Sequence, residues 1–165
     1  MPSKFQARLP YLFLVIVTLC LDRWTKSLIQ NRFSLNESVS VIDGLFNITY
    51  VQNTGVAFGI FSAISSPAKS VLLSLLTIVA AVVVVVYSVR SPVRNRLLQI
   101  ALGFILGGAL GNLYDRIRFG YVIDFLEFYF HSYHWPSFNV ADSAISTGVV
   151  LLGIEIIRNE TQTRT

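Results

Sequence analysis

Long apolar stretches are the feature that most limits how this chain of 165 residues can fold. Residues 70–89 and 97–113 carry no charged side chain, and residues 140–157 carry only Asp142 and Glu155. A helix needs about 20 apolar residues to cross the hydrocarbon core of a bilayer, which is roughly 30 Å thick. We therefore predict membrane-spanning helices at about residues 70–89, 97–113 and 140–157.

A further spanning helix is predicted at about residues 10–29, where apolar residues predominate but Asp22, Arg23 and Lys26 fall in the last two turns. Lys4 and Arg8 precede this stretch, as they would in a signal peptide. However, a lipoprotein-type cleavage before Cys20 requires a small preceding residue, and Leu19 is bulky. We therefore expect the segment to remain and to span. The single cysteine excludes an internal disulfide.

Composition agrees with an all-α membrane protein of one domain, residues 1–165, with four transmembrane helices. Hydrophobic residues make up 53% of the chain and charged residues 13%, and the mean hydropathy is +0.61. Such values lie outside the range of soluble globular proteins. The net charge of +4 is not arranged as a basic stripe with interleaved aromatics, so no nucleic-acid partner is expected.

Basic residues indicate the orientation of the helices, because cytoplasmic loops are enriched in Lys and Arg. They gather before the first helix, between the second and third, and after the fourth. Both termini should therefore face the cytoplasm, and the connections at residues 31–69 and about 114–139 should lie outside. The basic residues concerned are Lys4, Arg8, Arg90, Arg94, Arg96, Arg158 and Arg164.

The two outer connections have patterns of their own. Residues 38–51 alternate partly between β-branched or aromatic and polar residues, and Asp43-Gly44 is a turn signal. We therefore predict a small extracytoplasmic β element at about residues 38–62. The second connection is rich in Phe, Tyr and Trp, which is typical of an interfacial segment at headgroup level. In the third helix, Gly103, Gly107 and Gly111 predict close packing of another helix.

The polar clusters all fall at the predicted outer side, which suggests a site, but each has a structural alternative. Asp22 and Lys26 are spaced i, i+4 and can simply pair with each other. Asn53-Thr54-Gly55 can be a turn. The charged residues at the end of the third helix can simply mark its wet end, where cations are favoured by the helix dipole. These residues are Asp115, Arg116 and Arg118.

Asp124 and Asp142 make the strongest case for chemistry. Asn139 and Asp142 have the spacing of a helix N-cap and its capping box, so Asp142 alone could be structural. The aromatic segment after Asp124 can loop back and bring the two carboxylates together. Two neighbouring carboxylates share a proton, so that one acts on water as a base and the other as an acid. The N-terminus of the fourth helix would favour ionised Asp142, and low dielectric would favour protonated Asp124.

Other chemistries fit less well. His131 and His134 could bind a metal near Asp124, but there is no HExxH pattern, and histidines among aromatics are more often interfacial polar tips. Neither histidine belongs to a recognisable nucleophile motif, and no phosphate-binding glycine loop is present. We expect no metal and no cofactor.

Taken in order, a series of motifs resembles that of the lipoprotein signal peptidases, or signal peptidase II, and the resemblance covers nearly the whole chain. Each motif alone is weak, but their set, their order and the four predicted spans are specific. The motifs are Asp22-Arg-Trp-Thr-Lys26, Asn53-Thr-Gly-Val-Ala-Phe58, Gly111-Asn-Leu-Tyr-Asp-Arg116, Gly120-Tyr-Val-Ile-Asp-Phe125 and Phe138-Asn-Val-Ala-Asp142.

The resemblance implies roles for individual residues. The family's two catalytic aspartates fall on Asp124 and Asp142. Architectural roles fall on Asp22, Lys26 and Asp115, although Asp115 is a plausible rival for catalysis. Roles in binding the substrate or supporting the two acids fall on Asn53, Gly55, Asn112, Arg116 and Asn139.

The implied activity is that of an aspartic endopeptidase of the bacterial plasma (inner) membrane, which cuts prolipoproteins before a diacylglyceryl-modified cysteine and needs no metal. Its partners would be these lipidated substrates and membrane lipid, the protein would be a monomer, and the site would lie at the outer face. Two other interpretations stay open: a small proton- or cation-coupled transporter using Asp22, Asp124 and Asp142, and a structural subunit with carboxylates as interhelical contacts.

Overall fold

The computed structural model describes residues 6–55 and 67–164, which form long helices and a small sheet. The helices are α1 (Leu9–Arg32), α2 (Pro67–Arg90), α3 (Arg96–Phe119) and α4 (Val140–Arg164), with one 3-10 turn, η1 (Gln6–Arg8), before α1. The strands are β1 (Ser38–Ile42), β2 (Phe46–Asn53), β3 (Val122–Phe130) and β4 (Tyr133–His134). Of the β element predicted at 38–62, residues 56–62 lie outside the described residues.

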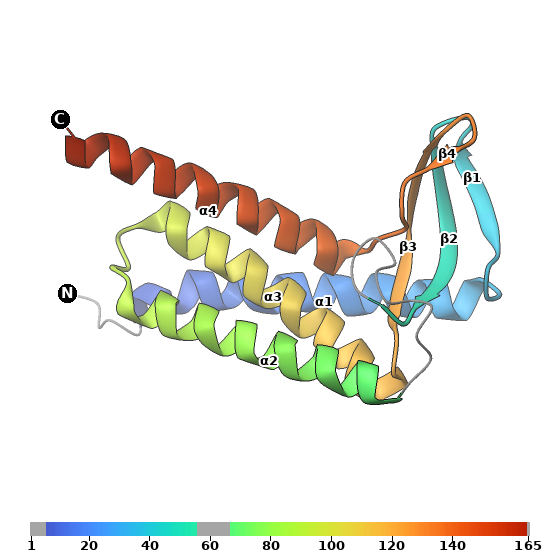
Figure 1. Cartoon of the computed structure of the whole chain (residues 1–165), viewed down its shortest axis with the longest axis horizontal. Helices are drawn as coiled ribbons and strands as arrows, with labels where there is room; N and C mark the ends of the chain where they lie inside the picture. Colours follow the sequence, from blue (N-terminus) through green and yellow to red (C-terminus); the bar gives the residue numbers. More distant parts are fainter. Residues whose placement is uncertain (1–5, 56–66, 165) are drawn as a thin grey trace.

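The helix α3 is the centre of the bundle, because it packs against α1, α2 and α4. Figure 1 shows an elongated molecule with the sheet at one end. The connection between α2 and α3 and the C-terminal part of α4 lie at the other end. The two outer connections of the sequence prediction therefore do meet on one side of the bundle.

Within the described residues, three helical segments are long and apolar enough to cross a membrane: Lys69–Arg90, Arg96–Phe119 and Val140–Asn159. The chain is thus a multi-pass membrane protein. The predicted first span also forms a helix, α1, but it is not one of the three. The reason is visible in its sequence, because Asp22, Arg23 and Lys26 interrupt the apolar run. A fourth crossing therefore rests on the prediction alone.

The description as an all-α protein was too narrow, since the strands form one antiparallel sheet in the order β1-β2-β3-β4. The β element pairs with the aromatic segment, which forms β3 and β4 instead of lying alone at the interface. In this register Val51 is the partner of Asp124. Tyr50, Ile123 and Phe125 form a buried cluster with Ile29 of α1, which fastens the sheet to the bundle.

Glycines allow the helices to approach closely, as the sequence predicted for the face of α3 that carries Gly107 and Gly111. A Cβ on Gly107 would lie 2.7 Å from Thr18 Cβ, and one on Gly111 would lie 2.5 Å from Asp22 Oδ2. The packing interpretation is confirmed. A second close contact joins α3 to α4, where a Cβ on Gly148 would lie 2.6 Å from the carbonyl oxygen of Ala101.

This contact predicts different outcomes for two glycines of α4. Gly148→Ala should destabilise the protein by about 1–3 kcal/mol, because the new methyl group meets backbone that cannot move aside. Gly153→Ala is the matched control, since a Cβ there meets nothing within 4 Å, and alanine has the better helix propensity. Thermal unfolding of the detergent-purified variants measures the difference, and equal unfolding temperatures would contradict the packing.

Candidate active site

A fully buried ammonium group, that of Lys26, is the origin of the polar network between the helices and the sheet. Its Nζ lies 2.8 Å from Asp22 Oδ2, 2.8 Å from Asp115 Oδ2 and 2.9 Å from Asn112 Oδ1. The contact with Asn112 is a hydrogen bond, and the contacts with the two carboxylates are ion pairs. The i, i+4 pair with Asp22 predicted from the sequence is confirmed, but it is only one third of the coordination.

Asp115 connects the helices to the sheet, and it is completely buried. One of its oxygens pairs with Arg23, whose guanidinium also lies 4.3 Å from the ring centre of Tyr114. The other oxygen forms an ion pair with Lys26 and accepts a hydrogen bond, at 3.3 Å, from the backbone N–H of Ile123. Since Ile123 directly precedes Asp124, this contact fixes the strand that carries the acid.

The N-terminus of α4 is capped from two directions. The Oδ1 atom of Asn139 accepts the N–H of Asp142 at 2.9 Å, and Asp142 Oδ2 accepts the N–H of Asn139 at 3.3 Å. This reciprocal pair is the predicted capping box. In addition, Asp22 Oδ1 accepts the N–H of Ala141 at 2.9 Å, so α1 supplies a cap to α4.

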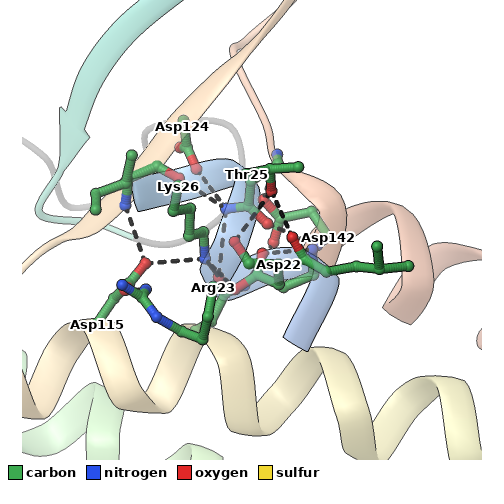
Figure 2. A network of polar contacts seen from close by, with 12 residues as sticks. Asp22, Arg23, Thr25, Lys26, Asp115, Asp124 and Asp142 are labelled. Atoms are coloured by element: carbon green, nitrogen blue, oxygen red, sulfur yellow. Dashed lines mark hydrogen bonds and ion pairs between the residues drawn. The ribbon is translucent and has the colours of Figure 1, made fainter. Parts of the chain in front are cut away.

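Asparagine side chains orient the two acids. Asp124 accepts Nδ2–H bonds from Asn139 at 2.7 Å and from Asn53 at 2.9 Å. Asp142 accepts one from Asn112 at 2.8 Å. The side chain of Asn139 thus reaches both carboxylates, since its Nδ2 donates to one and its Oδ1 holds the backbone of the other. Asp124 and Asp142 are therefore linked through Asn139, although they come from a strand and a helix (Figure 2).

Asp124 has the environment of an acid that retains its proton. It is 2% exposed, and burial, followed by the negative charge of Asp142, raises the pKa of its carboxyl to about 7. The hydrogen bonds from Asn53 and Asn139 act in the opposite direction, because they stabilise the ionised form. At neutral pH this carboxyl is therefore divided between its two protonation states, as an acid catalyst requires.

Both acids open onto a cavity of about 630 Å³ between α2, α3 and α4. Its remaining walls are largely apolar and include Leu76, Ile105 and Ile145. Arg116 also lines it and interacts electrostatically with both acids. Among the described residues, no hydrogen bond or ion pair uses its guanidinium. The cavity thus presents two acids and the guanidinium of Arg116 at the end of an apolar slot.

The structure brings together nearly all of the residues that the sequence singled out. Gly55 acts on the acids only indirectly. Its N–H donates to Asn53 Oδ1 at 2.8 Å, and this bond closes the turn that orients the Asn53 side chain. The turn interpretation of Asn53-Thr54-Gly55 is therefore correct, and the turn serves the site. Sequence reasoning missed the contributions of Arg23 and Ile123. The sequence shows Arg23 only as an extra charge, and no side-chain signal exists for a backbone N–H.

The histidines lie apart from the acids. His134 is exposed, stacks on Tyr129 and has Nδ1 3.1 Å from Glu127 Oε1. His131 has a positive φ of 54° in the turn between β3 and β4. In residues 6–55 and 67–164, no three His, Cys, Asp or Glu side chains are grouped as a metal site would need.

The comparisons with known proteins agree on one family. The family model described as Signal peptidase (SPase) II matches residues 14–158. A lipoprotein signal peptidase of Geobacter sulfurreducens is 46% identical and covers 88% of this chain and 90% of its own length. That of Syntrophus aciditrophicus is 43% identical, over 90% of this chain and 94% of its own. A solved bacterial membrane enzyme is similar in fold, with a TM-score of 0.84 and 29% identity over 93% and 90% of the two chains.

The network predicts that Lys26 is essential for stability. Lys26→Met should cost about 3–5 kcal/mol, because it leaves buried carboxylates without their shared cation. Arg32→Met is the matched control, since Arg32 is exposed in the last turn of the same helix. Unfolding in detergent, followed by intrinsic fluorescence, compares the two. A Lys26→Met protein as stable as wild type would show that the ammonium group does not hold the helices together.

Proposed function

This chain belongs to the signal peptidase II family, and from that premise we propose that it is an aspartic endopeptidase that cleaves bacterial prolipoproteins before their diacylglyceryl-modified cysteine. The observation that carries the proposal is the pair Asp124 and Asp142, oriented by shared asparagine contacts and open to an apolar cavity. A transporter would need no such shared pair, and the relatives are named as peptidases.

The cavity suits a substrate that is itself apolar. A signal helix and the acyl chains of a lipidated cysteine can enter from the bilayer between α2 and α4, because the slot is walled by side chains such as Leu73, Leu76 and Ile145. The peptide then reaches the polar end of the slot only at the scissile bond. Arg116, whose guanidinium has no hydrogen bond or ion pair with another described residue, can donate hydrogen bonds to carbonyl oxygens of the bound peptide.

In the proposed reaction, Asp142 is ionised and takes a proton from water, because the N-terminus of α4 and the amide of Asn112 stabilise its negative charge. The water oxygen bonds to the scissile carbonyl carbon while Asp124 gives its proton to the carbonyl oxygen. The tetrahedral diol then collapses: a hydroxyl proton returns to Asp124, the C–N bond breaks, and the leaving amine takes the proton from Asp142. Both acids end in their starting states.

Charge balance supports one proton on the pair. Around the site, the cations Lys26, Arg23 and Arg116 are matched by Asp22, Asp115 and a single further negative charge. A second ionised carboxylate would be uncompensated in a region of low dielectric. Asp115 is therefore assigned to architecture, because both of its oxygens are already occupied by cations and by the N–H of Ile123.

For the topology, we propose that α1 also crosses the bacterial plasma membrane, with both termini in the cytoplasm and the acids at the outer face. The apolar part of α1 faces outward through exposed side chains such as Phe13 and Ile16. The charged residues Asp22, Arg23 and Lys26 do not prevent the crossing, because they point into the bundle and are paired there. Basic residues at the opposite end of the bundle support the orientation.

The catalytic assignment predicts that Asp124→Asn and Asp142→Asn each lower cleavage of a lipidated prolipoprotein by at least about 10³-fold, because each removes one of the two proton-transfer groups. Asp43→Asn, in the exposed turn between β1 and β2, is the matched control and should cleave normally. The assay uses purified protein in detergent, with and without a chelator. Full cleavage by Asp124→Asn or by Asp142→Asn would rule out the two-acid mechanism. Loss of wild-type cleavage in the presence of the chelator would indicate that a metal ion is required.

The pKa of Asp124 predicts the pH profile. Because Asp124 must be protonated to act as the acid, kcat/KM should fall as the pH rises through about 7. Asn53→Ala removes a hydrogen bond that stabilises the ionised form, so the falling limb should move to higher pH. Initial rates of prolipoprotein cleavage across a pH series measure both curves. A limb that stays in place in Asn53→Ala would contradict the assignment of that limb to Asp124.

A further inference from the structure

A second polar hollow lies at the end of the bundle opposite the acids. It has a volume of about 540 Å³ and is formed by the start of α3 and the last turns of the spanning part of α4. Arg94, Arg96 and Arg158 line it together with Glu155. It shares no lining residue with the cavity at Asp124 and Asp142, so the proposed peptidase chemistry makes no use of it.

The three guanidinium groups are available for a ligand. Arg94, Arg96 and Arg158 are all exposed, and within the described residues no carboxylate pairs with any of them. Guanidinium groups bind phosphate oxygens through paired N–H donors. The location also matters, because the hollow is formed at the ends of two candidate spans, Arg96–Phe119 and Val140–Asn159, where spanning helices would meet phospholipid headgroups.

Glu155 is the unusual member of the hollow, since its side chain is only 4% exposed. Its Oε1 accepts from Asn95 Nδ2 at 2.8 Å and from Asn159 Nδ2 at 2.9 Å. Its Oε2 is buried and has no hydrogen-bond partner among the described residues. A buried carboxylate oxygen without a donor is costly, and none of the three arginines supplies one here. A ligand that fits the hollow would therefore supply a hydrogen-bond donor to Glu155 Oε2 and negatively charged oxygens to the three arginines.

We propose that this hollow binds the headgroup of a phospholipid that carries a primary ammonium group. The phosphate diester would take the guanidinium groups of Arg94, Arg96 and Arg158, and the ammonium would donate to Glu155 Oε2. Leu97 and Ile100, which also line the hollow, would contact the upper part of the acyl chains. A bound lipid would join the start of α3 to α4 on the face that lies opposite the active site.

Native mass spectrometry of the full chain in detergent tests the proposal with a matched pair of lipids. Phosphatidylethanolamine and phosphatidylcholine have the same phosphate, but only the first has N–H donors. We expect the ethanolamine lipid to bind about tenfold more tightly, which is the effect of one charge-assisted hydrogen bond. Equal binding of the two lipids, or preferred binding of phosphatidylglycerol, would overturn the ammonium assignment.

Variants separate the two halves of the headgroup. Glu155→Gln should reduce ethanolamine lipid binding to the level of the choline lipid, because Gln can keep the contacts with Asn95 and Asn159 but puts a donor where an acceptor was needed. The double variant Arg94→Gln, Arg96→Gln should weaken the binding of both lipids to the same extent. Arg90→Gln is the control, since Arg90 lies at the same membrane face but does not line the hollow.

The source of the ligand and the integrity of the variants need separate readouts. Soluble phosphoethanolamine has the same headgroup chemistry without acyl chains, and binding as tight as that of the lipid would replace the lipid with a soluble ligand. Prolipoprotein cleavage by each variant reports whether the far end remains folded. If Glu155→Gln does not fold, the ratio of the wild-type affinities for the ethanolamine and choline lipids still tests the proposal. If Glu155→Gln folds and this affinity ratio is unchanged, Glu155 does not bind the headgroup and has only a structural role.

Discussion

The burial of the Lys26 ammonium among the helices is the interaction on which the rest of the structure depends. A buried charge is stable only when oppositely charged or hydrogen-bonding groups surround it. Its three acceptors come from α1 and α3, and each of them also makes a second contact. Asp22 caps α4, Asp115 holds the first residues of β3, and Asn112 donates to Asp142. One cation thereby fixes the relative positions of three helices and the sheet.

A similar double use of one contact explains why capping and the proposed catalysis coincide at Asn139 and Asp142. A helix N-terminus requires acceptors for its free N–H groups, and a carboxylate that must stay ionised in low dielectric requires donors. The capping box satisfies both needs at once. Asp124 lies on a strand, and burial together with the negative charge of Asp142 raises the pKa of its carboxyl to about 7.

Much of this arrangement could be predicted from the sequence, and the failures have physical causes. Apolar runs without charges identify helices directly, and the Asn139–Asp142 spacing identifies a cap, because both signals are local. The pairing of β2 with β3 could not be predicted in the same way, since it joins residues far apart in the chain, such as Val51 and Asp124. The contact between Asp115 and the N–H of Ile123 has no side-chain signature at all. The helix α1 is ambiguous in sequence because its charges, which lower its hydropathy, are neutralised only in the folded bundle.

The groups that can bind a substrate are those that the polar network around Lys26 does not already use. Lys26 and the side-chain N–H groups of Asn53, Asn112 and Asn139 are engaged with one another or with the two acids. Among the described residues, the charged groups that remain open toward the cavity are the guanidinium of Arg116 and the two acids, and the hydroxyls of Ser137 and Ser146 also line it. Everything else along the slot is largely apolar. Under the proposed function, a peptide that enters from the bilayer would meet charged partners for its backbone only at Arg116 and the two carboxylates, so the proposed position of the bond to be cut follows from the largely apolar lining of the slot.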